Sequence, residues 1–467
     1  MLYNKFANKK YTKEVVCTSD LLYNEKNIIG RLYRYFYAYF ETFSMPTVET
    51  LFLLVLSMLA LESADSVRFL YRHFLSGITE KSLNAFYYAC SYAKADYSRF
   101  MNVTASMALK LIPKTLQPQP VFLCIDDTMV SKFGKKFENV SRLFDHAAHN
   151  GSNYLNGHCF VSIMLCVPVW KNNKCVYLSV PLGYRMWQKD ASKLNLAADM
   201  VRKVMPTLSG IRNVILLCDS WYAKKNLVGI VDEYENPDII CNARTDSVIY
   251  DLAPPKTGKR GRPAKHGKRL STENDFTFSD EKIGDYFIGV RRVLSNLFGE
   301  REVLAFVTST GNTDSSKRLF FSTVFPERIS MFCTWQEKAP LNQTGSDRMK
   351  YIPLFLYVFR WNIEVSYYEQ KTFWSLCSYM VRSRQGIEML VNLINISYCA
   401  MKILPYRDIS FQEYQDKSVQ EFRFVLSSQI REQIFYAHFA KNIENRIKSI
   451  PLINALKMLI QQQGYYF

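Results

Sequence analysis

Apolar residues recur at helical spacing in the N-terminal part of the chain, at residues 29–43, 48–61 and 82–111. This periodicity predicts a helical region over residues 1–117, which is a candidate for DNA binding although it carries no recognisable DNA-binding motif. The longest apolar run, residues 51–61, is too short to cross a bilayer and predicts a buried helix. No membrane association is therefore expected.

The pattern changes after Pro120, where short apolar runs typical of buried strands begin. Strand-like and helix-like segments then follow one another in the order three strands, helix, strand, helix and strand, which predicts a mixed α/β unit. The strands are expected at residues 121–125, 159–169, 175–182, 214–218 and 238–242, and the helices at residues 190–205 and 226–235.

A basic segment rich in Gly and Pro interrupts this unit at residues 256–269 and predicts a loop. Strand-like runs return at residues 286–294, 303–308 and 318–324, as expected of an inserted β subdomain. From residue 352 the spacing is helical again. The chain thus reads as an α/β core with a β insertion and helical ends.

Charge adds a functional indication, because 59 Lys and Arg residues against 42 Asp and Glu residues give a formal net charge of +17. A protein this basic usually binds a polyanion, and nucleic acid is the leading candidate. An anionic membrane surface and a generally basic proteome are the alternatives. The 11 Cys include no C-x2-C pair, and the N-terminus lacks the apolar core of a signal peptide. Both features favour a cytoplasmic protein with reduced thiols.

Two predicted strands end in aspartate, in the segments IDDT and LLCDS. Ligand sites of open α/β sheets form at this edge, so Asp127 and Asp219 are candidate catalytic carboxylates. Asp126 is the alternative to Asp127, since the strand register decides which of the two points into the site. A single strand-end aspartate is more often a turn or cap residue, but two at matching positions favour a site.

The segment YVFRWNIEVSYYEQK places a charged and aromatic strip along one face of a predicted helix. At about 100° per residue, Tyr357, Arg360, Glu364 and Lys371 fall within an arc of roughly 60°, with Trp361 beside them. The alternative is a solvated helix face with an i,i+4 ion pair and no functional role. Three separated carboxylates have a clear use in phosphodiester cleavage, where they hold two Mg²⁺ ions about 4 Å apart.

The spacing Tyr357-x2-Arg360-x3-Glu364-x6-Lys371 resembles the signature of bacterial insertion-sequence transposases of the insertion-sequence-four type, which are DDE transposases. IDDT is similar to the first-aspartate motif of that family, LLCDSWYA to the second, and KRLFFSTV to a strand that precedes the final helix. The resemblance covers residues 118–404.

The resemblance implies an α/β fold, with a ribonuclease-H-like mixed sheet that carries helices on both faces. An inserted β subdomain interrupts the sheet, and helical N- and C-terminal regions flank it. Two parts of the core are expected, at residues 118–243 and at residues 346–404, where the signature helix lies. The basic loop and β insertion occupy residues 244–345, and the helical C-terminal region occupies residues 405–467.

The resemblance also implies roles for individual residues. The metal-binding and catalytic residues would be Asp127, Asp219 and Glu364. The DNA-binding residues would be Tyr357, Arg360, Lys371 and Arg382, with Trp361 stacking on a flipped base and Trp335 as a weaker second stacking candidate.

The implied function is a transposase, an endonuclease and strand transferase that cuts DNA at transposon ends and joins them to target DNA. Its cofactor would be two Mg²⁺ ions, for which Mn²⁺ can substitute. Its partners would be double-stranded DNA, at terminal inverted repeats and target sites, and a second copy in a homodimer on DNA. It would act in the cytoplasm, at the nucleoid. A catalytically inactive DNA-binding descendant and a nuclease that does not transpose are the alternatives.

The basic insertion contains Arg260 and Arg262 in an RGRP core that is similar to the AT-hook, whose arginines enter a narrow minor groove. An unstructured loop that binds phosphates without sequence preference explains the segment equally well. Three nearby histidines, His146, His149 and His158, lack a fourth ligand at zinc spacing and favour a loop.

Overall fold

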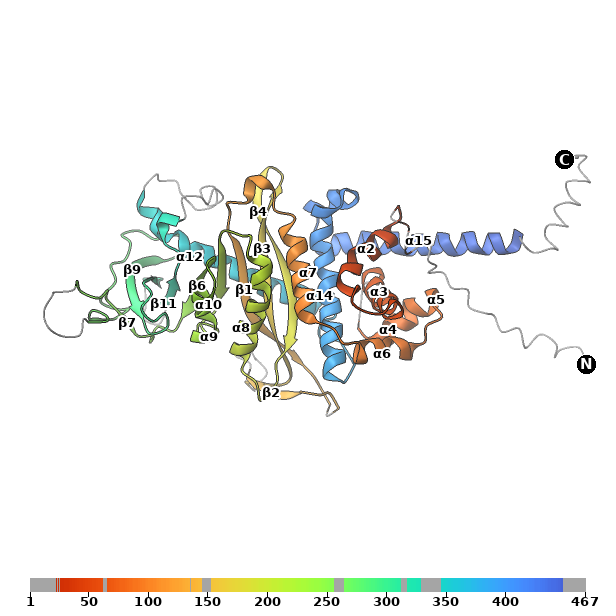
Figure 1. The fold of residues 1–467 in the computed structure, drawn as a ribbon, viewed down its shortest axis with the longest axis horizontal. Coiled ribbons are helices and arrows are strands. Elements are labelled where there is room, and N and C mark those ends of the chain that lie inside the picture. Colours follow the sequence, from red (N-terminus) through yellow and green to blue (C-terminus); the bar gives the residue numbers. More distant parts are fainter. Residues whose placement is uncertain are drawn as a thin grey trace, which may run out of the picture.

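The computed structural model describes the chain at residues 22, 24, 26–61, 65–134, 136–144, 153–255, 264–311, 317–328 and 346–447. Within these residues, one mixed sheet of 11 strands has the order β2-β3-β1-β5-β6-β11-β10-β9-β7-β8, with β4 paired to β3. It extends from the middle of the molecule, where β1, β3 and β4 lie, to one end, where β7 and β9 lie (Figure 1). The strands are β1 (Val121–Ser131), β2 (Ser141–Phe144), β3 (Tyr154–Lys171), β4 (Lys174–Met186), β5 (Val214–Cys218), β6 (Pro237–Ala243), β7 (Ile249–Tyr250), β8 (Arg269–Leu270), β9 (Phe287–Ser295), β10 (Val303–Ser309) and β11 (Arg318–Ser322).

The core of the sheet has the predicted ribonuclease-H-like arrangement. β1 is antiparallel to β3, and β3 to β4, whereas β1, β5 and β6 run parallel. The predicted strands and helices occur in the predicted order, but the structure adds the short strand β2 between the first two and divides the helix predicted at residues 226–235 into α9 (Lys225–Val228) and α10 (Ile230–Glu233). β1 is longer than predicted, because its backbone pairing with β3 continues to Ser131 although the apolar run stops at Ile125.

The insertion strands extend this core sheet. β11 pairs antiparallel with β6, and β10 and β9 follow on the outer side of β11. β6 therefore gains a partner along the edge that the core strands leave open, which removes an exposed row of backbone N–H and C=O groups. The insertion thus becomes continuous with the core strands (Figure 1).

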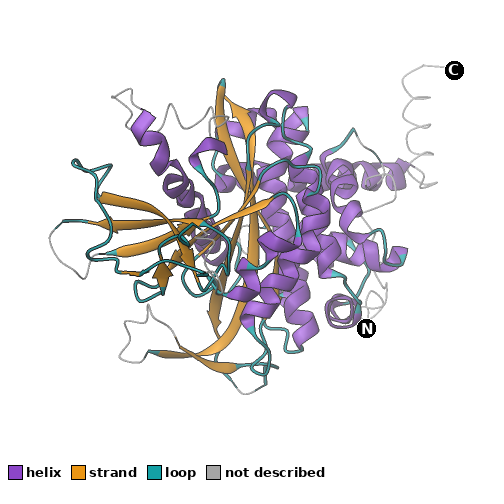
Figure 2. Cartoon of the chain, turned by 60° about the vertical axis from the view of Figure 1, so that its left-hand side comes forward, coloured by secondary structure: helices purple, strands orange, loops and turns teal. Residues whose placement is uncertain are grey.

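The helices surround the sheet and form most of the N-terminal part of the chain (Figure 2). Several begin where a serine side chain accepts a backbone N–H of the first turn, as Ser192 and Ser383 do. They are α2 (Ile28–Phe40), α3 (Met45–Ala60), α4 (Val67–Leu70), α5 (Ser76–Ile78), α6 (Leu83–Tyr92), α7 (Tyr97–Leu109), α8 (Lys193–Val204), α9 (Lys225–Val228), α10 (Ile230–Glu233), α12 (Ile352–Leu356), α13 (Trp361–Phe373), α14 (Arg384–Arg407) and α15 (Val419–Ile447).

The two faces of the core sheet are covered by different helices. On one face, the turn η7 (Tyr357–Arg360) and α13 lie over β1, where the ring of Phe122 stacks on that of Phe359 at 4.4 Å between centroids. The Cys124 thiol donates to the Phe359 carbonyl at 3.3 Å on this same face. On the other face, α8 packs against β3. Alternate side chains of β1 therefore point to α13 and to α8.

α14 protects the free edge of β4. The Asn392 side chain accepts the Tyr184 N–H and donates to the Tyr184 carbonyl, each at 3.0 Å, and the Glu388 carboxylate accepts the Met186 N–H at 2.8 Å. These contacts satisfy backbone groups that an edge strand would otherwise expose. α14 is long and apolar enough to cross a membrane, yet 94% of its apolar window is buried, as in a core helix.

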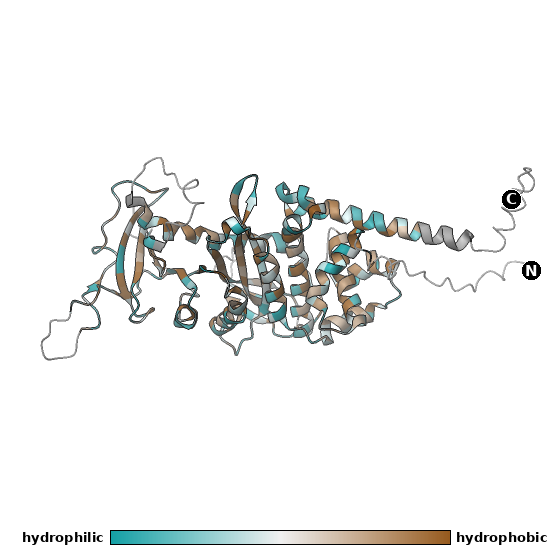
Figure 3. Ribbon diagram, turned by 45° about the horizontal axis from the view of Figure 1, so that its top comes forward, coloured by the Kyte–Doolittle hydropathy of each residue, from teal (hydrophilic) through white to brown (hydrophobic). Residues whose placement is uncertain are grey.

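Apolar residues concentrate in the sheet and in the helices packed on it (Figure 3). α15 joins the N-terminal helices to this core through the buried guanidinium of Arg423. That group donates to the carbonyl oxygens of Met58 at 2.9 Å, Leu61 at 2.7 Å and Phe373, and lies 4.0 Å from the ring centroid of Trp374. One side chain thus links α3, the end of α13 and α15.

Replacing Arg423 by Met should lower the free energy of unfolding by roughly 3 kcal/mol, because three buried carbonyls lose a charged donor. Urea denaturation measures the loss. The matched control is Arg431→Met on an outer position of the same helix, which should change stability by less than about 0.5 kcal/mol. Equal effects of the two substitutions would show that the buried guanidinium does not link these helices.

Candidate active site

Asp126 and Asp127 point to opposite faces of the sheet, and the register of β1 against β5 shows which of them lies on the same face as Asp219. Ile125 is paired with Cys218 in the parallel ladder, so the next residues along the two strands are Asp126 and Asp219. Neighbouring residues at the same level of a parallel pair point to the same face, and successive residues of a strand point to opposite faces. Asp126 therefore shares a face with Asp219, and Asp127 points to the other face.

Asp127 is held in a polar cluster on the α8 face. Its Oδ2 accepts from Lys193 Nζ at 3.0 Å and from the Cys159 thiol at 2.9 Å, and its Oδ1 accepts from the Tyr222 hydroxyl at 2.7 Å. The Asp127 and Lys193 side chains are only 15% and 22% exposed. Both carboxylate oxygens of Asp127 thus have partners within the protein, as expected of a structural ion pair.

Asp126 and Asp219 are crowded carboxylates on the α13 face. Burial, and then the negative charges of Asp219 and Asp127, raise the pKa of Asp126 to about 8. Burial also raises the pKa of Asp219, although the Tyr222 N–H opposes the shift. Asp219 Oδ1 accepts the N–H groups of Trp221 at 3.0 Å and Tyr222 at 3.1 Å, whereas its Oδ2 accepts no hydrogen bond from the described residues. Asp219 is thus a turn residue that keeps one oxygen available.

The signature helix supplies the facing charges. Its first turn, η7, is a tight 3-10 turn that places Tyr357 and Arg360 on one side, three residues apart. Arg360 lies 3.6 Å from Asp126 Oδ2 and donates to Glu364 Oε1. The Tyr357 hydroxyl donates to the Cys218 carbonyl at 3.2 Å, next to Asp219. Arg360 therefore connects the strand-end carboxylates to Glu364.

The other predicted site residues lie beside β1, on the exposed surface or outside the described residues. Lys371 Nζ donates to the Met129 carbonyl of β1 at 2.9 Å, so it lies beside the same strand. Trp361 is 58% exposed on α13, and Arg382 is exposed, with its carbonyl accepting the Glu138 N–H at 3.0 Å. Outside the described residues lie Arg260, Arg262, Trp335, His146 and His149.

His158 is buried, and its ring nitrogens hydrogen-bond to the Tyr379 hydroxyl at 2.7 Å and the Glu138 carbonyl at 2.8 Å. Both nitrogens of His158 therefore have partners within the protein, which is the pattern of a structural histidine. This agrees with the prediction that the histidines form no zinc site, as far as His158 is concerned.

No sequence pattern indicates the three side chains that hold Asp127. Lys193, Tyr222 and Cys159 come from a helix start, a turn and a neighbouring strand, with no spacing that relates them to Asp127. Only the pairing of β1 with β3 and β5 brings them together. The strand alternation at Asp126 and Asp127 was visible in the sequence, but the pairing that assigns each to a face was not.

The donor set of the α13 face suits a hard divalent cation. Carboxylate oxygens are the ligands that Mg²⁺ prefers, and burial, followed by the nearby charges of Asp219 and Asp127, raises the pKa of Asp126. Across the described parts of the chain, no three His, Cys, Asp or Glu side chains lie close enough to hold a metal ion together. Glu364 is turned to Arg360, so a third ligand requires this pair to separate.

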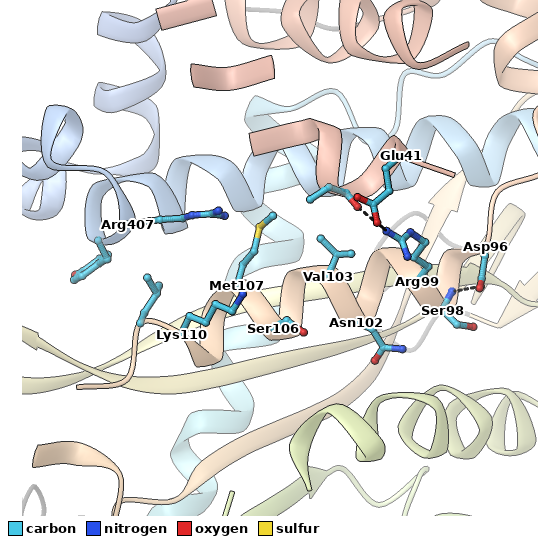
Figure 4. A pocket seen from close by; sticks show the side chains of 13 residues that line it. Glu41, Asp96, Ser98, Arg99, Asn102, Val103, Ser106, Met107, Lys110 and Arg407 are labelled. Atoms are coloured by element: carbon cyan, nitrogen blue, oxygen red, sulfur yellow. Dashed lines mark hydrogen bonds and ion pairs between the residues drawn. The ribbon is translucent and has the colours of Figure 1, made fainter. Parts of the chain in front are cut away.

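A cavity of about 690 Å³ lies among the helices, away from these carboxylates. It is lined by parts of α2 and α7 and by the end of α14 (Figure 4). Arg99 donates there to Glu41 and to the Ala38 carbonyl. The Asp96 side chain accepts the Ser98 N–H at 2.9 Å. Because these contacts link α2 and α7 internally, we assign them to packing of the helical region.

Replacing Asp126 by Asn should make stability less sensitive to pH. The folded protein retains the Asp126 proton up to about pH 8, whereas the unfolded chain loses it near 3.8, so this contribution is present below 3.8 and is lost as pH rises to about 8. In chelator, the Tm of D126N should therefore rise relative to wild type between about pH 5 and about pH 9. For the exposed control D285N, the difference in Tm from wild type should not change with pH. A pH-independent difference in Tm for D126N would contradict the burial of Asp126.

One comparison with known proteins found a match. The family model described as DDE superfamily endonuclease matches residues 51–283, which include β1, β5 and their aspartates but not the signature helix. No curated protein matches the chain. Proteins of the DDE superfamily use divalent metal ions, in agreement with the carboxylates at this edge. The match, together with the mixed α/β sheet, supports a DDE-type nuclease or transposase family for this chain.

Proposed function

We propose that this chain is a DNA transposase whose metal-binding carboxylates are Asp126, Asp219 and Glu364. The observation that carries the proposal is the common face of Asp126, in the middle of β1, and Asp219, directly after β5, opposite the helix that bears Arg360 and Glu364. The set differs from the sequence prediction in its first member. Asp127 points to α8 and is paired with Lys193, so Asp126 replaces it in the proposal.

The proposed cofactor is Mg²⁺, as two ions for which Mn²⁺ can substitute. Asp126, Asp219 Oδ2 and Glu364 are the oxygen ligands, with Glu364 released from Arg360. When bound, such ions activate the attacking oxygen and stabilise the leaving oxygen of a phosphodiester. Metal binding also offsets the burial of Asp126 and its repulsion by Asp219, which together raise the pKa of Asp126.

Arg360 and Lys371 are proposed to bind a phosphate of the cleaved strand. Arg360 is 14% exposed and carries a planar fork of donors that matches two phosphate oxygens. When Glu364 leaves Arg360, one side of this guanidinium becomes available to an anion. Lys371 already donates to the β1 backbone at Met129, so its ammonium lies beside the strand that carries Asp126.

The outer face of α13 carries an exposed apolar strip beside the carboxylates. Its members are three or four residues apart and therefore lie on one side of the helix: Val358 at 58% exposed, Trp361 at 58%, Val365 at 41% and Tyr368 at 63%. Aromatic side chains on such a surface stack on unpaired bases. We assign Trp361 as the residue that stacks on a base flipped out at the DNA end.

The proposed partners follow from the charge and the chemistry. The net charge of +17 favours a polyanionic substrate, and the family match favours DNA. We assign the terminal inverted repeats of the element and its target DNA as substrates, with a homodimer acting at paired ends in the cytoplasm, at the nucleoid. Arg382 is exposed at the end of the segment that follows α13, where it can contact the DNA backbone.

A cleavage and joining assay on a duplex that carries the element's own end tests the function. With Mg²⁺ or Mn²⁺, wild type should cut at the end and join it to a second duplex. D126N, D219N and E364Q should each lose more than about 10³-fold in rate, as expected of residues that act as a unit.

The matched control is the double variant D127N/K193M, which removes the α8-face ion pair without leaving one charge unpaired and should retain cutting. Cutting that survives in D126N but is lost in the double variant would return Asp127 to the site. Cutting without joining would identify a nuclease that does not transpose. Binding without cutting by wild type would identify an inactive descendant.

Replacing Trp361 by Ala should weaken binding to DNA ends with an unpaired base about tenfold or more, since stacking contributes roughly 1–3 kcal/mol per base. Folding should be unaffected because the side chain is exposed. Fluorescence anisotropy with end duplexes that do and do not carry an unpaired base measures the difference. The control W170A removes an exposed Trp near the carboxyl end of β3 and should bind both duplexes as wild type does. Wild-type binding of both duplexes by W361A would exclude stacking.

A further inference from the structure

A second cleft adjoins the carboxylates at the junction of the core sheet and the insertion. The register of three strands forms it: Cys218 is paired with Cys241, which sets Asn242 beside Asp219, and Asn242 is paired with Phe320 of β11. β11 is antiparallel to β6, so its first residues reach the edge where β1, β5 and β6 end. Residues that are remote in sequence therefore meet beside Asp219.

The cleft has a volume of about 410 Å³ and an unbalanced charge. Its charged lining residues are four cations, Arg244, Lys317, Arg318 and Arg360, and one carboxylate, Asp219. Such an excess of positive charge in a concave surface attracts anions. The cleft thus differs from the Asp127 cluster, in which one lysine faces one aspartate.

The insertion arginines are arranged at some cost to the fold. Leu319 is paired with Ala243, so the next pair of positions brings Arg318 opposite Arg244, and like charges at facing positions of a sheet repel each other. Arg318 is exposed and forms no ion pair with the described residues. Arg244 is paired with Asp246, but at 69% and 66% exposed the pair is weak and readily exchanged for another anion.

The remaining lining fits a sugar-phosphate strand. Ser220, Asn242 and Thr245 provide neutral donors of the kind that contact phosphate oxygens. Phe320 and Tyr357 form an apolar wall, with ring centroids 5.1 Å apart. Arg360 belongs to the cleft and to the carboxylate cluster, so an anionic strand in the cleft continues to the reacting phosphate.

We infer that Arg244, Lys317 and Arg318 bind the backbone of the DNA strand that leads to the scissile phosphate. This inference rests on the proposed function, because it takes the carboxylates at Asp219 as the place of cleavage. The insertion then serves as part of the substrate-binding surface, and its β11 strand fixes the distance between the bound backbone and the carboxylates.

The test is DNA binding in EDTA, which requires no catalysis. Full-length wild type and the double variant K317A/R318A bind a fluorescein-labelled duplex of mixed sequence, and anisotropy gives the affinity over a series of salt concentrations. The plot of log K against log salt has a negative slope, and its magnitude should be smaller by about 2 in the double variant. Each lost phosphate contact removes about one released ion. The loss in affinity should shrink as salt rises.

Two further variants distinguish backbone binding from a general loss of charge or of folding. R318K keeps the charge and should keep the wild-type slope. R292A removes an exposed arginine of β9, which β10 separates from β11, and should also keep the slope, because Arg292 is paired with Glu327 outside the cleft. A slope for K317A/R318A equal to that of R292A would overturn the inference, whether or not wild type cuts DNA.

The two proposals fail in different ways. A reduced slope in K317A/R318A, with a wild type that never cuts under Mg²⁺ or Mn²⁺, would support the DNA-binding cleft and contradict the proposed cleavage. Wild-type cutting with an unchanged slope in the double variant would do the reverse. A wild type that binds no DNA would overturn both.

Discussion

The parallel pairing of β1 with β5 is the constraint on which the candidate site depends. Because Ile125 is level with Cys218, Asp126 and Asp219 lie side by side on one face, and Asp127 is left to the other. A slip of one residue would exchange the two aspartates and bury the wrong carboxylate under α13. The pairing of the buried residues Val121–Ile125 with β5 sets this register, so the assembled core determines which aspartate is available for chemistry.

Arg360 gives the site its second property. One guanidinium faces Asp126 and Glu364, with Asp219 nearby, so three carboxyl groups share one arginine on the α13 face. Glu364 shares its Oε1 with Arg360, and while it does so Arg360 cannot offer its full set of donors to a phosphate. Cation binding and phosphate binding therefore favour each other, and the substrate completes the site.

Sequence patterns predicted the core fold because its signals are local. Apolar runs mark β5 and β6, and helical spacing marks α8 and α13. Long-range pairing was not predictable: nothing in the sequence shows that β11 joins β6, or that Lys193 meets Asp127. The spacing of the signature residues gave their common face, while the identity of the first carboxylate depended on a register that only the assembled sheet defines.

The central claim is that Asp126 and Asp219, not Asp127, hold divalent metal together with Glu364. Electron paramagnetic resonance of Mn²⁺ measures this directly, since bound Mn²⁺ loses the six-line signal of the free ion. Wild type and D127N/K193M should bind Mn²⁺ with similar affinity, and D126N, D219N and E364Q should each bind it more weakly. Undiminished binding in D126N, with binding lost in D127N/K193M, would contradict the assignment of the two faces of β1.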